Sequence, residues 1–163
     1  MLKVICTMAE LPFGKLMEIC RQSNRENGEQ WAYESPERQM ALAEQAVYAY
    51  LRQCFFTRPG SKYFIWEQQN KAVCALRCES YADGWLLTAL ETDPDYRRKG
   101  YATQLLEAVL LHLGTGKVYA HIHQDNHASK SVHLRCGFIK VKSGARMLDG
   151  SYSSLHDTYL KEL

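Results

Sequence analysis

The fold is decided by residues 90–103, which read Leu90-Glu91-Thr92-Asp93-Pro94-Asp95-Tyr96-Arg97-Arg98-Lys99-Gly100-Tyr101-Ala102-Thr103. A strand ends here, a polar turn with two arginines, a lysine and a glycine follows, and a helix begins at once. The unpaired N–H groups and the positive dipole end of a helix N-terminus attract phosphates. Gly100 lets the backbone approach a ligand closely, and Ala102 leaves the first helical turn unobstructed. The stretch therefore predicts a cradle for a diphosphate.

The segments on either side of this turn have clear periodicity. Apolar residues recur at i, i+3, i+4, i+7, i+8 and i+11, which predicts a helix over 101–113 that Gly114 ends; they are Ala102, Leu105, Leu106, Val109, Leu110 and Leu113. Before the turn, residues 85–92 are expected to form a strand. The preceding Ala82-Asp83-Gly84 predicts a hairpin turn in which the glycine supplies a positive φ.

The same patterns assign the rest of the chain. Strands are expected over 2–8, 63–67, 72–79, 117–123, 138–142 and 155–160, and helices over 13–20, from Ser35-Pro36-Glu37 to about Phe55, and over 128–136. The polar residues 22–35 are expected to form a loop. This order of elements predicts an α/β (α+β) fold, a mixed sheet with helices on its faces.

Length and composition limit the classes of protein to consider. The chain has 163 residues, which fits a single domain over 1–163, with 20 Lys and Arg against 18 Asp and Glu. A net charge of +2 gives no basis for a nucleic-acid or membrane partner, and no apolar run is long enough to span a membrane. No secretion signal is present, so the six cysteines are expected to be reduced thiols packed as small hydrophobic side chains in the cytoplasm.

A second motif lies downstream of the turn. Asn126-His127-Ala128-Ser129 opens a short predicted helix, and Gly137-Phe138 follows eight residues after the serine. Together with Arg97-Arg98-Lys99-Gly100-Tyr101-Ala102, this pattern resembles the GNAT superfamily of acyl-CoA-dependent N-acyltransferases, whose signature is Arg/Gln-x-x-Gly-x-Gly/Ala between the fourth strand and the next helix. The resemblance covers about residues 62–142. It implies a mostly antiparallel central sheet of about seven strands and the transfer of an acetyl group from acetyl-CoA to an amine.

The resemblance also implies a cofactor site. The fourth strand would bind the pantetheine arm, the loop after it would hold the pyrophosphate, and the second motif would contact the pantetheine region. The expected cofactor-binding residues are Thr92, Arg97, Arg98, Lys99, Gly100, Tyr101, Ala102, Thr103, Asn126 and Ser129.

Direct transfer requires an amine that has lost its proton and a leaving thiolate that is protonated or stabilised. Many relatives place a tyrosine on the short helix, four residues before Gly-Phe, as the acid, whereas this chain has His133 there. Glu91 and His123 are the candidates for the base, each through a chain of waters, and the sequence does not choose between them. As structural alternatives, Glu91 would face solvent or pair with Arg97, and His133 would be a core or surface histidine.

The acceptor is predicted only in outline. Glu26, Glu29 and Glu34, beside Trp31 and Tyr33, suggest a cationic small molecule, and the function expected is an N-acetyltransferase of a small primary amine. A protein lysine or N-terminal acetyltransferase and a non-catalytic acyl-CoA sensor are the alternatives. No metal is expected, because His121, His123, Asp125 and His127 do not complete a recognised ligand spacing. Many relatives pair through sheet edges or final strands, so a homodimer is the assembly that the resemblance allows.

Overall fold

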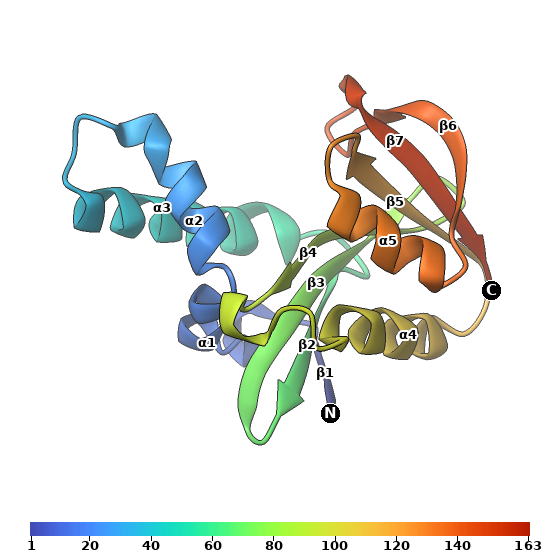
Figure 1. Ribbon diagram of the computed structural model, residues 1–163, viewed down its shortest axis with the longest axis horizontal. Helices are drawn as coiled ribbons and strands as arrows, with labels where there is room; N and C mark the ends of the chain where they lie inside the picture. The colour runs from blue at the N-terminus through green and yellow to red at the C-terminus, as the bar shows by residue number, and fades with distance from the viewer.

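A computed structural model describes residues 1–163. Seven strands form one sheet in the order β1-β2-β3-β4-β5-β7-β6, and every neighbouring pair is antiparallel except β4 and β5 (Figure 1). The α/β fold with a mixed, mostly antiparallel sheet of seven strands is therefore confirmed. The strands are β1 (Leu2–Ile5), β2 (Lys62–Gln68), β3 (Lys71–Tyr81), β4 (Gly84–Thr92), β5 (Lys117–His123), β6 (Ile139–Arg146) and β7 (Tyr152–Glu162).

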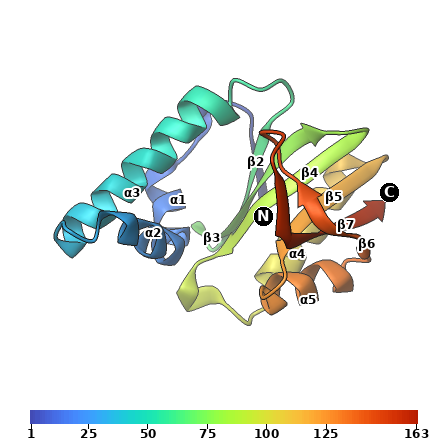
Figure 2. The same cartoon turned by 90° about the horizontal axis from the view of Figure 1, so that it is seen from above.

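Helices cover both faces of this sheet (Figure 2). They are α1 (Phe13–Ile19), α2 (Arg21–Gly28), α3 (Pro36–Tyr50), α4 (Tyr101–Leu113) and α5 (His127–Arg135), with a π-helical turn η3 (Leu51–Phe55) and short 3₁₀ turns η1 (Met8–Glu10), η2 (Glu29–Trp31) and η4 (Pro94–Tyr96). Helices α2 and α3 form an arm that projects from the sheet (Figure 1). No helix combines the length and the apolar character needed to cross a bilayer.

Strand alternation divides the core into two clusters. Phe64 and Cys74 pack in the cluster that contains α4, whereas Ile65 and Ala75, their neighbours in sequence, pack in the cluster that contains α1 and η3. Successive strand residues point to opposite faces, so each central strand has an α4 face and an α1 face. This division decides which site residues share a face.

The prediction of a loop over residues 22–35 is wrong. Helix α2 occupies Arg21–Gly28, followed by η2. The segment has no apolar stripe, and its helix depends on packing against α1 and α3. Asn24 is buried with Nδ2 3.4 Å from Met17 Sδ, and a Cβ on Gly28 would lie 3.2 Å from the Gln39 carbonyl oxygen. Tertiary contacts thus override a polar local sequence.

The hairpin between β3 and β4 forms where it is predicted, but for a different reason. The positive φ belongs to Ala82, at +48°, and not to Gly84. Gly84 is required for close approach instead, because a Cβ there would lie 2.1 Å from the Lys117 carbonyl oxygen on β5. The glycine therefore allows β4 and β5 to pair.

The cysteines also depart in part from the expectation. All six are free, and four are buried, but Cys6 and Cys54 are exposed.

Candidate functional site

Strands β4 and β5 pair for only part of their length. Their parallel pairing runs from Gly84 opposite Lys117 to Leu87 opposite Ala120 and then stops. On its other edge β4 carries a bulge against β3, where Ala89 has a φ of +49°. A bulge bends its strand and increases the local twist. The backbone of β4 beyond Leu87 is therefore left without a partner on its β5 side, and a cleft opens there.

This cleft has a volume of about 610 Å³. Its walls come from α2, the end of β4, the loop before α4, the first turn of α4 and helix α5. The lining residues are Gln22, Ser23, Glu26, Leu90, Glu91, Thr92, Tyr96, Arg97, Arg98, Gly100, Tyr101, Ala102, Thr103, Asn126, Ala128, Ser129, Val132 and Arg135. All the residues predicted to bind cofactor are brought together here except Lys99.

The N-terminus of α4 forms one end of the cleft. The first hydrogen bond of the helix runs from the Gln104 N–H to the Gly100 carbonyl oxygen, at 3.0 Å, so the N–H groups of Tyr101, Ala102 and Thr103 have no acceptor in the helix. Gly100 has a φ of +82°, and no side chain caps the helix. The nearest atom to a Cβ built on Gly100 is Gln104 Nε2, at 3.7 Å. The helix end is thus open and suited to an anion.

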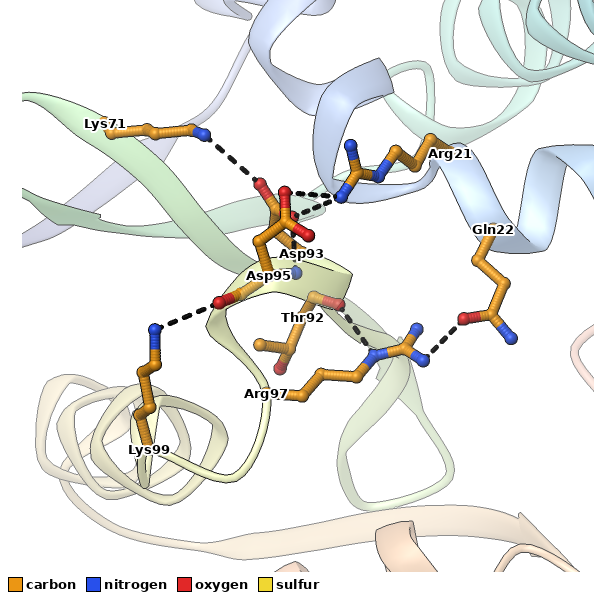
Figure 3. Close-up of polar contacts among 8 residues, drawn as sticks. All are labelled: Arg21, Gln22, Lys71, Thr92, Asp93, Asp95, Arg97 and Lys99. Atoms are coloured by element: carbon orange, nitrogen blue, oxygen red, sulfur yellow. Dashed lines mark hydrogen bonds and ion pairs between the residues drawn. The ribbon is translucent and has the colours of Figure 1, made fainter.

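Arg97 links this loop to the projecting arm. Its Nε donates to the Thr92 carbonyl oxygen at 3.2 Å, and its Nη1 donates to Gln22 Oε1 of α2 at 2.5 Å (Figure 3). Arg98, the next residue, is exposed and has a φ of +58°. Lys99 turns back instead of facing the cleft, because its Nζ donates to the Asp95 carbonyl oxygen at 3.0 Å.

A second set of contacts fixes the end of β4. The buried carboxylate of Asp93 accepts from Arg21 Nη2 at 3.3 Å and from the Asp95 N–H at 3.0 Å, and lies 3.6 Å from Lys71 Nζ. The same Arg21 nitrogen lies 2.7 Å from Asp95 Oδ2, and this pairing holds the pKa of the Asp95 carboxyl below its usual range (Figure 3). Helix α2 is therefore anchored by charge to the turn that leads into α4.

Glu91 lies on the wall where α2 faces β4 and is half-buried. Burial raises the pKa of its carboxyl above the ordinary value, and the nearby negative charge of Glu26 acts in the same direction. The Ser23 hydroxyl and the Arg97 guanidinium oppose this by favouring the charged form. A carboxylate with a raised pKa in a cleft is suited to accept a proton.

The two predicted histidines do not line the cleft. His133 is the buried residue of α5; its Nδ1 lies 2.8 Å from the Ser129 carbonyl oxygen, and its ring meets the Phe138 ring edge-on at 5.0 Å. A carbonyl oxygen only accepts, so the proton is on Nδ1. Burial lowers the pKa of His133, although the hydrogen bond to the Ser129 carbonyl oxygen opposes this. The alternative of a core histidine describes this environment, and the only contact toward the cleft is the Ser129 hydroxyl, 3.3 Å from Nδ1.

His123 lies at the end of β5 outside the cleft. Its Nδ1 accepts from the Asp125 N–H at 3.2 Å, and its ring packs edge-on against His156 of β7. No group of three or more His, Cys, Asp or Glu side chains is arranged to hold a metal ion.

Helix α5 contributes the second motif. Asn126 caps the helix, since its Oδ1 accepts from the Ser129 N–H at 3.0 Å. Asn126 and Ser129 both line the cleft. The capping role of Asn126 is therefore compatible with a contact to a ligand.

The acceptor residues suggested by the sequence are separated by the structure. Glu26 lines the cleft, whereas Glu29, Trp31, Tyr33 and Glu34 do not. Sequence reasoning also missed Gln22 and Ser23, because helix α2 was expected to be a loop.

The family model described as "Acetyltransferase (GNAT) family" matches residues 20–138. No curated protein sequence matches the chain.

Several solved structures share the fold. The PaiA N-acetyltransferase from Thermoplasma acidophilum, solved in complex with coenzyme A, has a TM-score of 0.67 at 15% identity over 100% of this chain and 99% of its own. Aminoglycoside 6'-acetyltransferase type Ii has a TM-score of 0.63 at 15% identity over 99% and 96%. The ribosomal-protein-S18-alanine N-acetyltransferase from Escherichia coli has a TM-score of 0.56 at 18% identity over 98% and 91%.

Proposed function

The chain belongs to the acetyltransferase (GNAT) family, and from this premise we propose that it moves the acetyl group of acetyl-CoA directly to the primary amine of a small molecule. The observation that carries the proposal is the cleft between β4 and α5, which joins the open N-terminus of α4 to the half-buried carboxylate of Glu91. One end suits a diphosphate and the other suits a proton transfer.

The pyrophosphate of acetyl-CoA would bind at the start of α4. The N–H groups of Tyr101, Ala102 and Thr103 are available there, and the exposed cation of Arg98 adds to the attraction. The bare Cα of Gly100 leaves space for the phosphates. The PaiA N-acetyltransferase from Thermoplasma acidophilum, which shares the fold, was solved in complex with coenzyme A, and this supports acetyl-CoA as the donor.

The pantetheine arm would extend along β4. Beyond Leu87 this strand has no partner on its β5 side, so its peptide groups are available to the amides of the arm. Asn126 and Ser129 line the cleft on the α5 side, where they would contact the arm. A free β4 N–H group is also suited to polarise the thioester carbonyl.

The reaction replaces the C–S bond of the thioester with a C–N bond, and overall one proton leaves nitrogen and one is taken up by sulfur. The lone pair of the neutral amine attacks the thioester carbonyl carbon, the C–N bond forms, and the C–S bond breaks to release the thiolate of coenzyme A. The amine proton passes to Glu91, directly or through water, and the thiolate takes up a proton from a donor in the cleft or from solvent. The raised pKa of Glu91 brings the carboxylate closer to the amine in proton affinity, which favours the transfer.

The cysteines support direct transfer over an acyl-cysteine intermediate. Cys74 is the thiol beside the cleft, with its Sγ 3.2 Å from Thr92 Oγ1, and burial raises its pKa to about 12. Burial also raises the pKa of Cys20 to about 12. A thiol with such a pKa is a poor nucleophile at neutral pH.

The acidic wall supports an amine acceptor. Glu26 and Glu91 both line the cleft and face the side where α2 closes it. Two carboxylates favour the approach of a protonated amine, which loses one proton to solvent before it attacks the thioester.

The test is a thiol-release assay. Purified protein, acetyl-CoA and a panel of primary amines and peptides are mixed, and free coenzyme A thiol is measured against a sample without protein. We expect release with at least one small amine. Release only with peptides would instead identify a protein acetyltransferase. Tight coenzyme A binding in calorimetry with no release from any acceptor would identify a non-catalytic sensor.

A further inference from the structure

The guanidinium of Arg77, on β3, has no ion-pair partner. Its guanidinium carbon lies 4.9 Å from the centre of the Tyr50 ring and 6.0 Å from that of Phe55. None of the ion pairs in the protein includes Arg77, and its side chain donates no hydrogen bond. Its Nε is buried and has no partner. A half-buried charge that only aromatic rings stabilise is an unusual arrangement unless something else pairs with it.

Two neighbouring residues, on β4 and β5, also have a buried polar atom without a hydrogen-bond partner. Thr88 of β4 lies opposite Arg77 in register, and His121 of β5 comes directly after the last β4–β5 pair. Thr88 Oγ1 and His121 Nε2 are also buried without a hydrogen-bond partner. Because buried polar atoms nearly always have a partner, three such atoms in one row across three strands are suited to a polar ligand or to water.

The row lies on the α1 face of the sheet. Ala120 and Leu87 belong to the core under α4, so the residues after them, His121 and Thr88, point to the opposite face. All three residues are half-buried, although their unpartnered atoms are themselves buried. Glu91 is on the same face, because its β3 partner Ala75 belongs to the core under α1.

Arg77 makes no ion pair with the charged residues around the row. Glu79, the next β3 residue on this face, is buried and paired with Arg58, so its charge is already neutralised. The neighbours of the row on this face include Tyr81, Tyr119 and His156, and burial lowers the pKa of His121 and of His156. Farther along, the Asp83 carboxylate accepts from the Tyr119 hydroxyl and is paired with Lys117. The face therefore has an acidic end at Glu91 and a basic centre at Arg77.

We propose that the acceptor is a small amino carboxylate, whose carboxylate binds Arg77, Thr88 and His121 while its amine faces Glu91. The inference rests on the proposed acetyl transfer and narrows its substrate class. A carboxylate would supply the anion that Arg77 lacks and would accept from the Thr88 hydroxyl and from His121 in the tautomer protonated on Nε2.

The spacing agrees with a small molecule. The row that holds Ala75 and Glu91 and the row that holds Arg77 and Thr88 are two β3 residues apart, or about 7 Å along the strand. The Arg77 charge is close enough to lower the pKa of Glu91, although burial raises it more. An amine and a carboxylate separated by a few bonds span this distance.

The experiment compares acceptors of the same carbon skeleton in the thiol-release assay. Amino acids, their carboxamides and the corresponding decarboxylated amines are assayed with the wild-type protein and with Arg77→Gln, Arg77→Lys and Arg52→Gln. Arg52 is an exposed arginine of η3 and serves as the matched control for loss of one positive charge. Thermal melting and coenzyme A calorimetry establish that each variant is folded.

We expect the wild-type kcat/KM for the best carboxylate acceptor to exceed that for its carboxamide by about 10- to 100-fold, the range of a charge-assisted hydrogen bond. Arg77→Gln should remove this preference by lowering only the carboxylate value, Arg77→Lys should restore part of it, and Arg52→Gln should leave it unchanged.

Three outcomes would overturn the inference. If carboxamides or simple amines react as well as carboxylates with the wild-type protein, the acceptor is not recognised by its carboxylate, and the proposed acetyl transfer still stands. If Arg77→Gln lowers both acceptor classes equally, Arg77 is structural. If no acceptor releases thiol, the inference and the proposed transfer fail together. If Arg77→Gln does not fold, the comparison of carboxylate and carboxamide acceptors with the wild-type protein decides whether the carboxylate is recognised.

Discussion

Replacing Gly100 with aspartate should abolish most of the affinity for coenzyme A. The cleft is open at this position, since a Cβ would have no neighbour closer than 3.7 Å, so steric exclusion is not the main effect. The added carboxylate would lie at the helix end where the N–H groups of Tyr101, Ala102 and Thr103 are free. Two unit charges 4 Å apart repel by about 4 kcal/mol at an effective dielectric constant of 20. Screening by salt reduces this to roughly 2–4 kcal/mol, or about 30- to 1000-fold in Kd.

Gly100→Asn is the matched control, because it has the same shape without the charge. Both variants must adopt the φ of +82°, a conformation that Asn and Asp tolerate better than other residues, so their folding costs should be similar. Isothermal titration of coenzyme A at two salt concentrations measures the difference. We expect the asparagine variant to lose less than about tenfold and the aspartate defect to shrink at high salt. An aspartate variant that binds within threefold of the asparagine variant would refute the phosphate cradle.

Two further changes test the chemistry and the sheet. Glu91→Gln should lower kcat by about 10²- to 10⁴-fold. Because the base works only when it is ionised, wild-type activity should fall as the pH drops through the raised pKa of Glu91. If the kcat–pH profile of the variant shows the same acidic fall, Glu91 is not the base. Gly84→Ala should destabilise the fold by about 2–4 kcal/mol in urea titrations, because its Cβ would lie 2.1 Å from a β5 carbonyl oxygen. Gly14→Ala, in α1 with nothing within 4 Å, should instead stabilise by about 0.5–1 kcal/mol, and equal effects of the two alanines would contradict the close approach.

The sequence predicts the elements around the cleft because their signals are local. Helix α4 and strand β5 have the predicted bounds, 101–113 and 117–123, since an apolar stripe and strict alternation are properties of consecutive residues. Helix α2 has no such stripe, and its contacts with α1 and α3 are made across the chain. The site residues on α2, Gln22 and Ser23, could therefore not be predicted, because their polar segment is typical of a loop.

The histidines show a different limit. A motif fixes a residue's position along the chain, and His133 is where relatives place their acid, but a motif does not specify which way one side chain of a short helix points. The helix turns His133 inward, against Phe138, while Ser129 and Val132 face the cleft. Arg77 shows the converse case. Nothing in its local sequence distinguishes it, and only the strand register places it beside Thr88 and on the face of Glu91.

Strand β4 explains why one cleft can serve two substrates. Thr92 pairs with Cys74 of the core under α4, and Glu91 pairs with Ala75 of the core under α1, so adjacent residues point to opposite faces. A ligand bound at the start of α4 and a ligand bound on the α1 face are then separated by a single strand. They can meet only where β5 has left the edge of β4, and that happens directly after Leu87. The early end of the β4–β5 pairing is thus the feature on which the proposed reaction depends, and Glu91 is the carboxylate that this geometry places beside the opening.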